Sequence, residues 1–142
     1  MLKPNRLAQL EAQVPGVLLA MLGYGEARGE GSQGILAVMH VATNRAAKGI
    51  TTLKDVILAP YQFSCFNHND PNRDLLLMAD KDTPQTWGQC AAIAELVLTP
   101  NATNDPTHGA THYYASSIPP PAWTQGWTQT AIIGHHTFGI AV

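Results

Sequence analysis

Residues 17–30, VLLAMLGYGEARGE, constrain the fold more than any other stretch, because an apolar run ends there in two carboxylates. If residues 17–26 are helical, Leu18, Leu22 and Glu26 lie at positions i, i+4 and i+8 and share one face. We expect that face to be buried, where a charge is costly and the pKa of a carboxyl group is raised. A raised pKa suits a general acid that works near neutral pH. Alternatively, Glu26 ends a core helix and points into solvent, and this stretch alone leaves both interpretations open.

Length and composition predict one globular domain. The chain has 142 residues, of which 45% are hydrophobic and 13% charged, so it can bury a core and lacks the composition of a disordered protein. Its net charge of −2 argues against a nucleic-acid partner. No stretch approaches the roughly 18 apolar residues of a membrane span, and no secretory signal is evident. We expect a monomer without membrane insertion, and the two cysteines, Cys65 and Cys90, to be reduced, although a disulfide between them stays open.

Local patterns predict that the first hundred residues are mostly helical. A short helix is expected to begin at Asn5, and a helix over 15–27 carries a proline in its first turn. Ser32 is the expected N-cap of a helix over 33–47 that Gly49 ends. Further helices are predicted over 53–58, capped by a threonine, over 74–80, and over 84–98, with residues 61–73 as a surface loop.

The last forty residues predict a small β-region. Residues 110–115 favour a strand, whereas three consecutive prolines exclude a helix or central strand from residues 116–126. Residues 127–142 are typical of two strands joined by a turn at Gly134. The predicted fold class is therefore α+β and mainly helical, with a small C-terminal β-region and a lead-in over residues 1–15.

Two features point to glycan chemistry. Glu26 and Glu30 are four residues apart, and like charges at that spacing are unfavourable on a helix that serves only stability, so we predict a function for at least one of them. The alternative for Glu30 is a solvated residue at a helix end. Residues 61–64 (YQFS) combine aromatic faces with amide and hydroxyl groups, which suits a sugar-binding cleft but also a loop anchored by buried aromatics.

Histidines and tryptophans supply two further features. The histidines invite a metal site, but the HExxH and CxxC patterns are absent, so we predict no metal and expect these side chains to bind a polar substrate or to lie in the core. The proline-rich segment with Trp123 and Trp127 predicts the rim of a groove, or alternatively a stiff loop packed by one tryptophan. The histidines concerned are His108, His112, His135 and His136.

Taken in order, these segments resemble the SleB-type cell wall hydrolase family, which comprises spore cortex-lytic enzymes and related bacterial and phage domains that cleave peptidoglycan. The resemblance covers about residues 16–138. The matching segments are 24–30 (YGEARGE), 37–45 (AVMHVATNR), 62–64 (QFS), 91–98, 109–114 (GATHYY), 121–123 (PAW) and 133–138 (IGHHTF). Two positions depart from the family's pattern: Gly139 stands where a second aromatic is frequent, and His135 where asparagine is common.

The resemblance implies a lysozyme-like fold, similar to lytic transglycosylases, with residues 16–142 as the catalytic domain and Glu26 as the catalytic acid. It also implies cleavage of glycan strands between N-acetylmuramic acid and N-acetylglucosamine by a lytic transglycosylase that needs no cofactor. A two-carboxylate glycosidase needs a second acid across the cleft, and Glu30 is expected on the same helix as Glu26, where it is poorly placed. The alternatives are a hydrolytic muramidase, a zinc-dependent amidase or peptidase, and a non-catalytic glycan-binding module.

The remaining expectations concern the cleft and the location of the protein. Because no signal peptide is evident, the resemblance favours a phage or prophage endolysin that waits in the host cytoplasm and reaches the cell wall after membrane disruption. Glu30 is predicted to contact the substrate in a secondary role, or to have a structural role. The residues predicted to bind the glycan strand are Tyr24, Gln62, Phe63, Ser64, His112, Tyr113, Tyr114 and Trp123.

Overall fold

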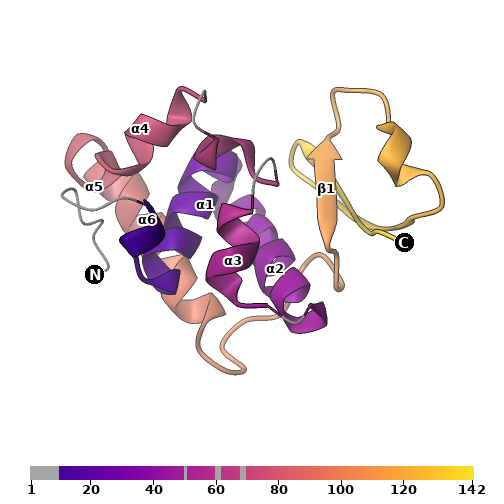
Figure 1. The fold of residues 1–142 in the computed structure, drawn as a ribbon, viewed down its shortest axis with the longest axis horizontal. Helices are drawn as coiled ribbons and strands as arrows, with labels where there is room; N and C mark the ends of the chain where they lie inside the picture. Colours follow the sequence, from indigo (N-terminus) through magenta and orange to yellow (C-terminus); the bar gives the residue numbers. More distant parts are fainter. Residues whose placement is uncertain (1–9, 50, 60–61, 68–69) are drawn as a thin grey trace.

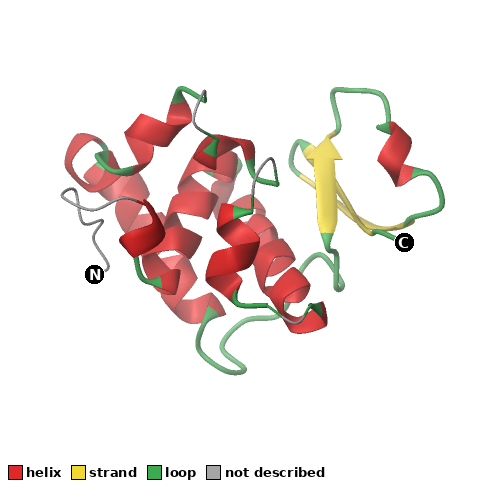
Figure 2. Cartoon of the chain, in the orientation of Figure 1, coloured by secondary structure: helices red, strands yellow, loops and turns green. Residues whose placement is uncertain are grey.

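Helices form one side of the molecule and a small sheet forms the other (Figures 1 and 2). The computed structural model describes residues 10–49, 51–59, 62–67 and 70–142, so the predictions for Asn5 and Tyr61 lie outside the described residues. The helical side contains η1 (Leu10–Ala12), α1 (Pro15–Ala27), α2 (Gly31–Lys48), α3 (Leu53–Leu58), η2 (Ser64–Phe66), α4 (Asn72–Leu76), α5 (Ala79–Asp82) and α6 (Pro84–Val97). The sheet side contains β1 (His112–Ala115), η3 (Ala122–Thr124), β2 (Thr128–Ile133) and β3 (His136–Ile140).

Helix α1 forms the centre of the helical side (Figure 1). It begins and ends as predicted, with Pro15 in its first turn, and Leu18 and Leu22 are fully buried. Because the whole run from Val17 to Leu22 is apolar, the helix can be covered on every side, and it packs against α2, α3, α4 and α6. Glu26 lies in the last turn of this helix, so its side chain reaches solvent only where the neighbouring elements leave a gap.

The cap predicted for α2 is wrong. The helix begins at Gly31, Glu30 occupies the N-cap position, and Ser32 lies within the first turn, where its Oγ accepts a hydrogen bond of 3.1 Å from Gln89. Gly31 adopts a φ of +76°, in the left-handed region that favours glycine, so the chain changes direction sharply between α1 and α2.

The segment predicted as one helix over 74–80 forms two short helices, α4 and α5. The first helix begins at Asn72, before the predicted position, and follows a turn in which the Asp70 side chain accepts a hydrogen bond of 2.8 Å from the backbone N–H of Asn72. In contrast, α3 has the predicted bounds, and Thr52 caps it by accepting a hydrogen bond from Asp55 N at 3.1 Å. Helix α6 buries Trp87, Ala91 and Ala94 as expected.

The sheet is antiparallel with strand order β1-β3-β2, which places the last strand in the middle. Its two C-terminal strands confirm the predicted hairpin, with Gly134 in the turn at a φ of +56°. Gly139 lies in the central strand, where an added Cβ would be 2.6 Å from the Trp127 ring and 2.7 Å from Thr128 O. The Trp127 indole therefore covers the position at which the chain lacks a second aromatic residue.

The C-terminal end of α2 holds the segment that leads into β1. Asn44 Nδ2 donates to Asp105 Oδ2 at 2.8 Å and to Ala110 O at 2.9 Å, and Arg45 Nε donates to Thr111 O. Burial raises the pKa of Asp105, but the hydrogen bonds from Thr107, Asn44 and Gly109 outweigh it and lower that pKa. These contacts bring β1 alongside the helical side.

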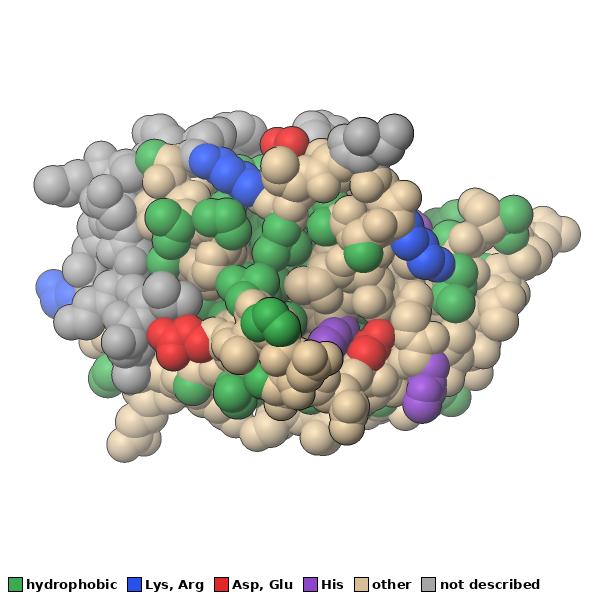
Figure 3. Space-filling view, turned by 90° about the horizontal axis from the view of Figure 1, so that it is seen from below, with side chains coloured by type: hydrophobic (Ala, Val, Ile, Leu, Met, Phe, Trp, Pro, Cys, Tyr) green, Lys and Arg blue, Asp and Glu red, His purple; other side chains and the backbone are tan. Residues whose placement is uncertain are grey.

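The surface drawn in Figure 3 carries few charged side chains, and those of the described residues lie apart from one another among apolar and neutral groups. None of the described helices is long and apolar enough to cross a membrane.

Candidate active site

A cleft of about 430 Å³ lies where the last turn of α1 faces the sheet. We call it the central cleft. It contains six of the ten residues predicted for the site: Glu26, Gln62, Ser64, Tyr113, Tyr114 and Trp123. The other residues that line it are Arg45, Ala115, Ile118, Pro121 and His136. The helical and β-region predictions therefore converge on one cavity.

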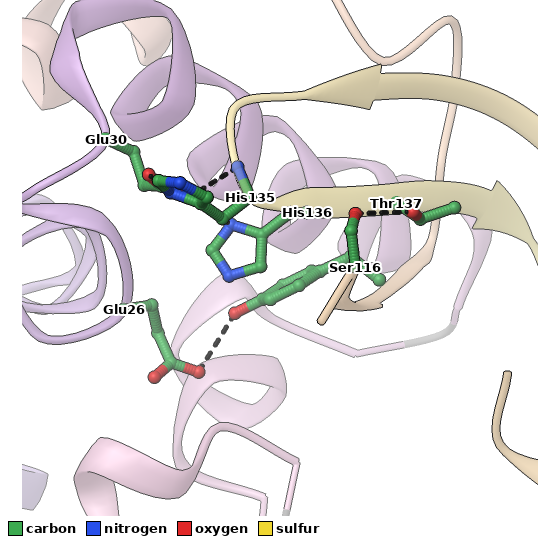
Figure 4. A network of polar contacts seen from close by, with 7 residues as sticks. Glu26, Glu30, Ser116, His135, His136 and Thr137 are labelled. Atoms are coloured by element: carbon green, nitrogen blue, oxygen red, sulfur yellow. Dashed lines mark hydrogen bonds and ion pairs between the residues drawn. The ribbon is translucent and has the colours of Figure 1, made fainter. Parts of the chain in front are cut away.

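Glu26 is half-buried in this cleft and accepts a hydrogen bond of 2.9 Å from the Tyr113 hydroxyl, 87 residues along the chain (Figure 4). Burial raises the pKa of its carboxyl group, and the negative charge of Asp70 adds to this. The hydrogen bonds from Tyr113 and Cys65 act in the opposite direction but are outweighed. Glu26 thus keeps its proton to a higher pH than an ordinary glutamate, which is the behaviour expected of a general acid.

Glu30 does not share a helical face with Glu26, contrary to the prediction. Helix α1 ends at Ala27, and Glu30 turns toward the β2–β3 hairpin (Figure 4). Its Oε1 accepts from His135 N at 2.9 Å and its Oε2 lies 2.7 Å from His135 Nδ1. Burial raises the pKa of Glu30, but these hydrogen bonds and the nearby histidines outweigh it and lower that pKa. Glu30 therefore joins the helical side to the hairpin, and its predicted contact with substrate stays a prediction.

His136 is a cleft residue that the predicted site did not include. Its Nδ1 lies 3.4 Å from Glu30 Oε1, and its ring packs edge-on against Tyr113 with the centroids 4.9 Å apart. Figure 4 shows the imidazole between Glu30 and Glu26. Burial is the main cause that lowers the pKa of His136, so the ring favours its neutral form. The matching segment 133–138 contained it, but two adjacent histidines gave no means of choosing between them.

Two further hollows extend the central cleft. The Glu30 hollow, of about 510 Å³, is lined by residues 25–30, His135 and His136, so it shares Glu26 and His136 with the cleft. The Arg45 hollow, of about 460 Å³, shares four residues with the cleft. It is lined by Arg45, Gln62, His112, Tyr113, Trp123, Ala141 and Val142. The three form one groove, with Glu26 at the junction of the cleft and the Glu30 hollow.

A family model described as Cell Wall Hydrolase matches residues 29–139, more than half of the chain. The chain belongs to the SleB-type cell wall hydrolase family. This confirms the predicted enzyme class, one that acts on peptidoglycan. Glu26 lies just before the matched range, so its assignment in this hydrolase depends on the cleft geometry.

Solved structures agree with this assignment. The catalytic domain of the Bacillus cereus SleB protein is 25% identical to the hydrolase, with a TM-score of 0.64 and 88% of each chain covered. The catalytic domain of the germination-specific lytic transglycosylase SleB from Bacillus anthracis is 26% identical, with a TM-score of 0.64, 96% of this chain covered and 98% of that chain. A search of curated proteins finds no match. The predicted lysozyme-like, mainly helical fold is confirmed.

Two predicted cleft residues of the hydrolase lie in the core instead. Tyr24 is 4% exposed, bonds to Thr83 Oγ1 at 2.7 Å and packs against Trp87. Phe63 is 1% exposed and lies beneath the Arg45 guanidinium, 4.9 Å from its ring centroid. Both are corrections with one cause: an aromatic residue beside a polar motif can serve the core, and the local sequence does not show which side it faces.

The four predicted histidines lie in different parts of the structure. His135 and His136 accompany Glu30, whereas His112 borders the Arg45 hollow and packs against Trp123 with centroids 5.6 Å apart. His108 is exposed. In the part of the chain that the structure describes, no group of three or more His, Cys, Asp or Glu side chains is arranged to hold a metal ion. Both cysteines are buried and free.

Proposed function

We propose that this hydrolase cleaves the bond between N-acetylmuramic acid and N-acetylglucosamine as a lytic transglycosylase, with Glu26 as acid and then base. One observation carries the proposal. Of the described residues that line the central cleft, Glu26 is the sole carboxylic acid, and its pKa is raised. The similar SleB domain from Bacillus anthracis is a lytic transglycosylase, which supports the same chemistry.

The reaction needs only one carboxyl group. Protonated Glu26 gives its proton to the glycosidic oxygen as the bond from that oxygen to the muramyl C1 breaks. The resulting carboxylate then accepts the proton of the muramyl C6 hydroxyl, while O6 bonds to C1 and closes a 1,6-anhydro ring. No water is consumed, and Glu26 returns to its protonated state. The Tyr113 hydroxyl, at 2.9 Å, stabilises the carboxylate formed between the two steps.

The main alternative is a hydrolytic muramidase, which requires a second group to activate water. Glu30 is engaged by His135 and lies on the far side of His136 from Glu26, so it is a poor candidate. Asp70 acts on Glu26 through its charge but does not line the central cleft. These positions favour the one-carboxyl reaction.

Product analysis tests the proposal. Purified sacculi are digested with the hydrolase and the soluble muropeptides are analysed by mass spectrometry. We expect 1,6-anhydro ends, which are lighter than reducing ends by one water. Glu26→Gln should abolish product release, whereas Glu95→Gln, a matched change at an exposed position of α6, should retain it. Reducing ends would establish the muramidase instead, and wild-type activity of Glu26→Gln would refute the role of Glu26.

The other interpretations make different predictions. A zinc-dependent amidase or peptidase would lose activity in excess EDTA and would release peptides rather than sugars. A non-catalytic glycan-binding module would sediment with cell walls without releasing any product. We also propose an endolysin role in a phage or prophage, which predicts that cells making the protein lyse only after the membrane is permeabilised.

A further inference from the structure

Arg45 has a position that the proposed chemistry does not use. It lies near the C-terminal end of α2, is half-buried, and borders both the central cleft and the Arg45 hollow. Its Nε donates to Thr111 O, and its Nη1 donates to Gln62 Oε1 at 3.3 Å. Both partners are neutral. Among the described residues, no acceptor is bonded to Nη2.

The charge of Arg45 has no carboxylate partner among the described residues, since the ion pairs found there all involve Glu30. The seven residues that line the Arg45 hollow include no acidic side chain. His112 adds no positive charge at neutral pH, because burial and the charge of Arg45 lower its pKa to about 4. The side chains that line the hollow therefore include one partly desolvated cation and no acidic group, and such a cation gains most from an anionic ligand.

The guanidinium also has the geometry for a carboxylate. Its planar fork can donate two parallel hydrogen bonds to the two oxygens, and packing over the Phe63 ring fixes its orientation. Nε is engaged by Thr111 O and Nη1 shares one hydrogen bond with Gln62, so Nη2 and the second hydrogen of Nη1 remain for a ligand. In peptidoglycan the sugar rings are neutral, whereas the peptide stem carries carboxylates, and muramic acid without a peptide carries one on its lactyl group.

We propose that Arg45 and the Arg45 hollow form a subsite for a peptidoglycan carboxylate, beside the bond that Glu26 cleaves. This inference rests on the proposed function, because it places the substrate along the same groove. The subsite stabilises the bound ground state and the transition state of charged strands equally. It therefore acts on KM and leaves kcat nearly unchanged.

The test compares soluble glycan strands with their carboxylates intact and the same strands with those groups converted to amides. For the wild-type hydrolase we expect KM to rise about tenfold on amidation, which is about 1.4 kcal/mol, with kcat retained. Arg45→Gln should have the same high KM on both substrates, and Arg45→Lys should recover part of the preference because it keeps the charge. In intact strands the lactyl carboxyl is part of the bond to the peptide, so amidating them tests the carboxylates of the stem. Strands stripped of peptides by an amidase expose the lactyl carboxylate, and amidating those strands tests that group; the strands whose KM rises on amidation identify the source.

Two results would overturn the proposal. One is a wild-type KM that does not respond to amidation of either the intact or the stripped strands. The other is an Arg45→Gln variant whose KM rises by the same factor on both substrates, so that it still prefers the charged strands. That result is expected if Arg45 only fixes β1 through its bond to Thr111 O. Mass spectrometry of every digest separates this from failure of the proposed function, because anhydro products would still form if the subsite alone were wrong.

Discussion

The Tyr113 hydroxyl offers a direct test of how the cleft controls its acid. Tyr113→Phe removes the oxygen that lies 2.9 Å from Glu26 Oε1 and leaves the aromatic ring in place. That ring packs against His136 and Phe138, with centroid distances of 4.9 and 5.5 Å, so the fold should survive the change. The expected effect is on the pKa of Glu26.

The magnitude follows from the strength of one hydrogen bond. A hydrogen bond to a charged group contributes about 1.5–3 kcal/mol, and we take the lower end because Glu26 borders the groove. One pKa unit corresponds to about 1.4 kcal/mol. Because the Tyr113 hydroxyl favours the ionised carboxylate, its removal should raise the pKa of Glu26 by about one unit.

Two measurements check this. The alkaline limb of the profile of kcat/KM against pH, where Glu26 loses its proton, should move up by about one pH unit, and a ¹³C NMR titration of the Glu26 carboxyl should show the same shift. The control is Tyr114→Phe, which removes a hydroxyl from the same cleft at a site without a bond to Glu26. An unmoved or lowered limb, or an equal shift in the control, would refute the reasoning.

Three more predictions concern stability and reactivity. Gly25→Ala should lower the free energy of unfolding by about 2 kcal/mol, because the added Cβ would lie 2.6 Å from Cys65 Sγ. The control is Gly29→Ala, which has no atom within 4 Å and should change the free energy of unfolding by less than about 0.5 kcal/mol; equal effects in chemical denaturation would contradict the packing argument. Glu26→Gln should raise Tm more at pH 8 than at pH 5. Because the pKa of Glu26 is higher in the folded state than in the unfolded state, ionising this buried carboxyl costs stability as the pH rises through those two values, and glutamine does not ionise. Calorimetry at both pH values checks this, and a larger gain at pH 5 would contradict it. Cys65 and Cys90 should react slowly with Ellman's reagent in the native state, because burial raises the pKa of both thiols, that of Cys90 to about 12. After unfolding without reductant, two thiols per chain should react; fast labelling of the native protein, or fewer than two reactive thiols, would count against free buried cysteines.

Local sequence was sufficient for most helices and for the hairpin. A first-turn proline and an unbroken apolar run determine α1, and a threonine cap determines α3, because helix boundaries depend on residues within one turn of the end. Two helix starts were harder to predict. Helix α4 begins at Asn72, whose backbone N–H bonds to the Asp70 side chain, and Glu30 occupies the N-cap position expected for Ser32 although its side chain caps no backbone group of α2.

Periodicity also identified Glu26 as an acid at the end of a buried face, and the half-buried side chain agrees with that expectation. The same reasoning could not separate Tyr113, which bonds to Glu26, from Tyr24 and Phe63, which lie in the core. All three are aromatic residues beside polar motifs. Whether each of these side chains faces the cleft or the core depends on packing against elements that are distant in the sequence.

The sequence by itself determined the helical framework, the small sheet, the family and an acid at the end of a buried helix. Only the tertiary structure decided what surrounds that acid. Tyr113 is 87 residues from Glu26, and His135 is 105 residues from Glu30, so no local pattern could pair them. The pKa of an acid is set by burial and by the donors that reach it, and both exist only once α1 and the sheet have come together.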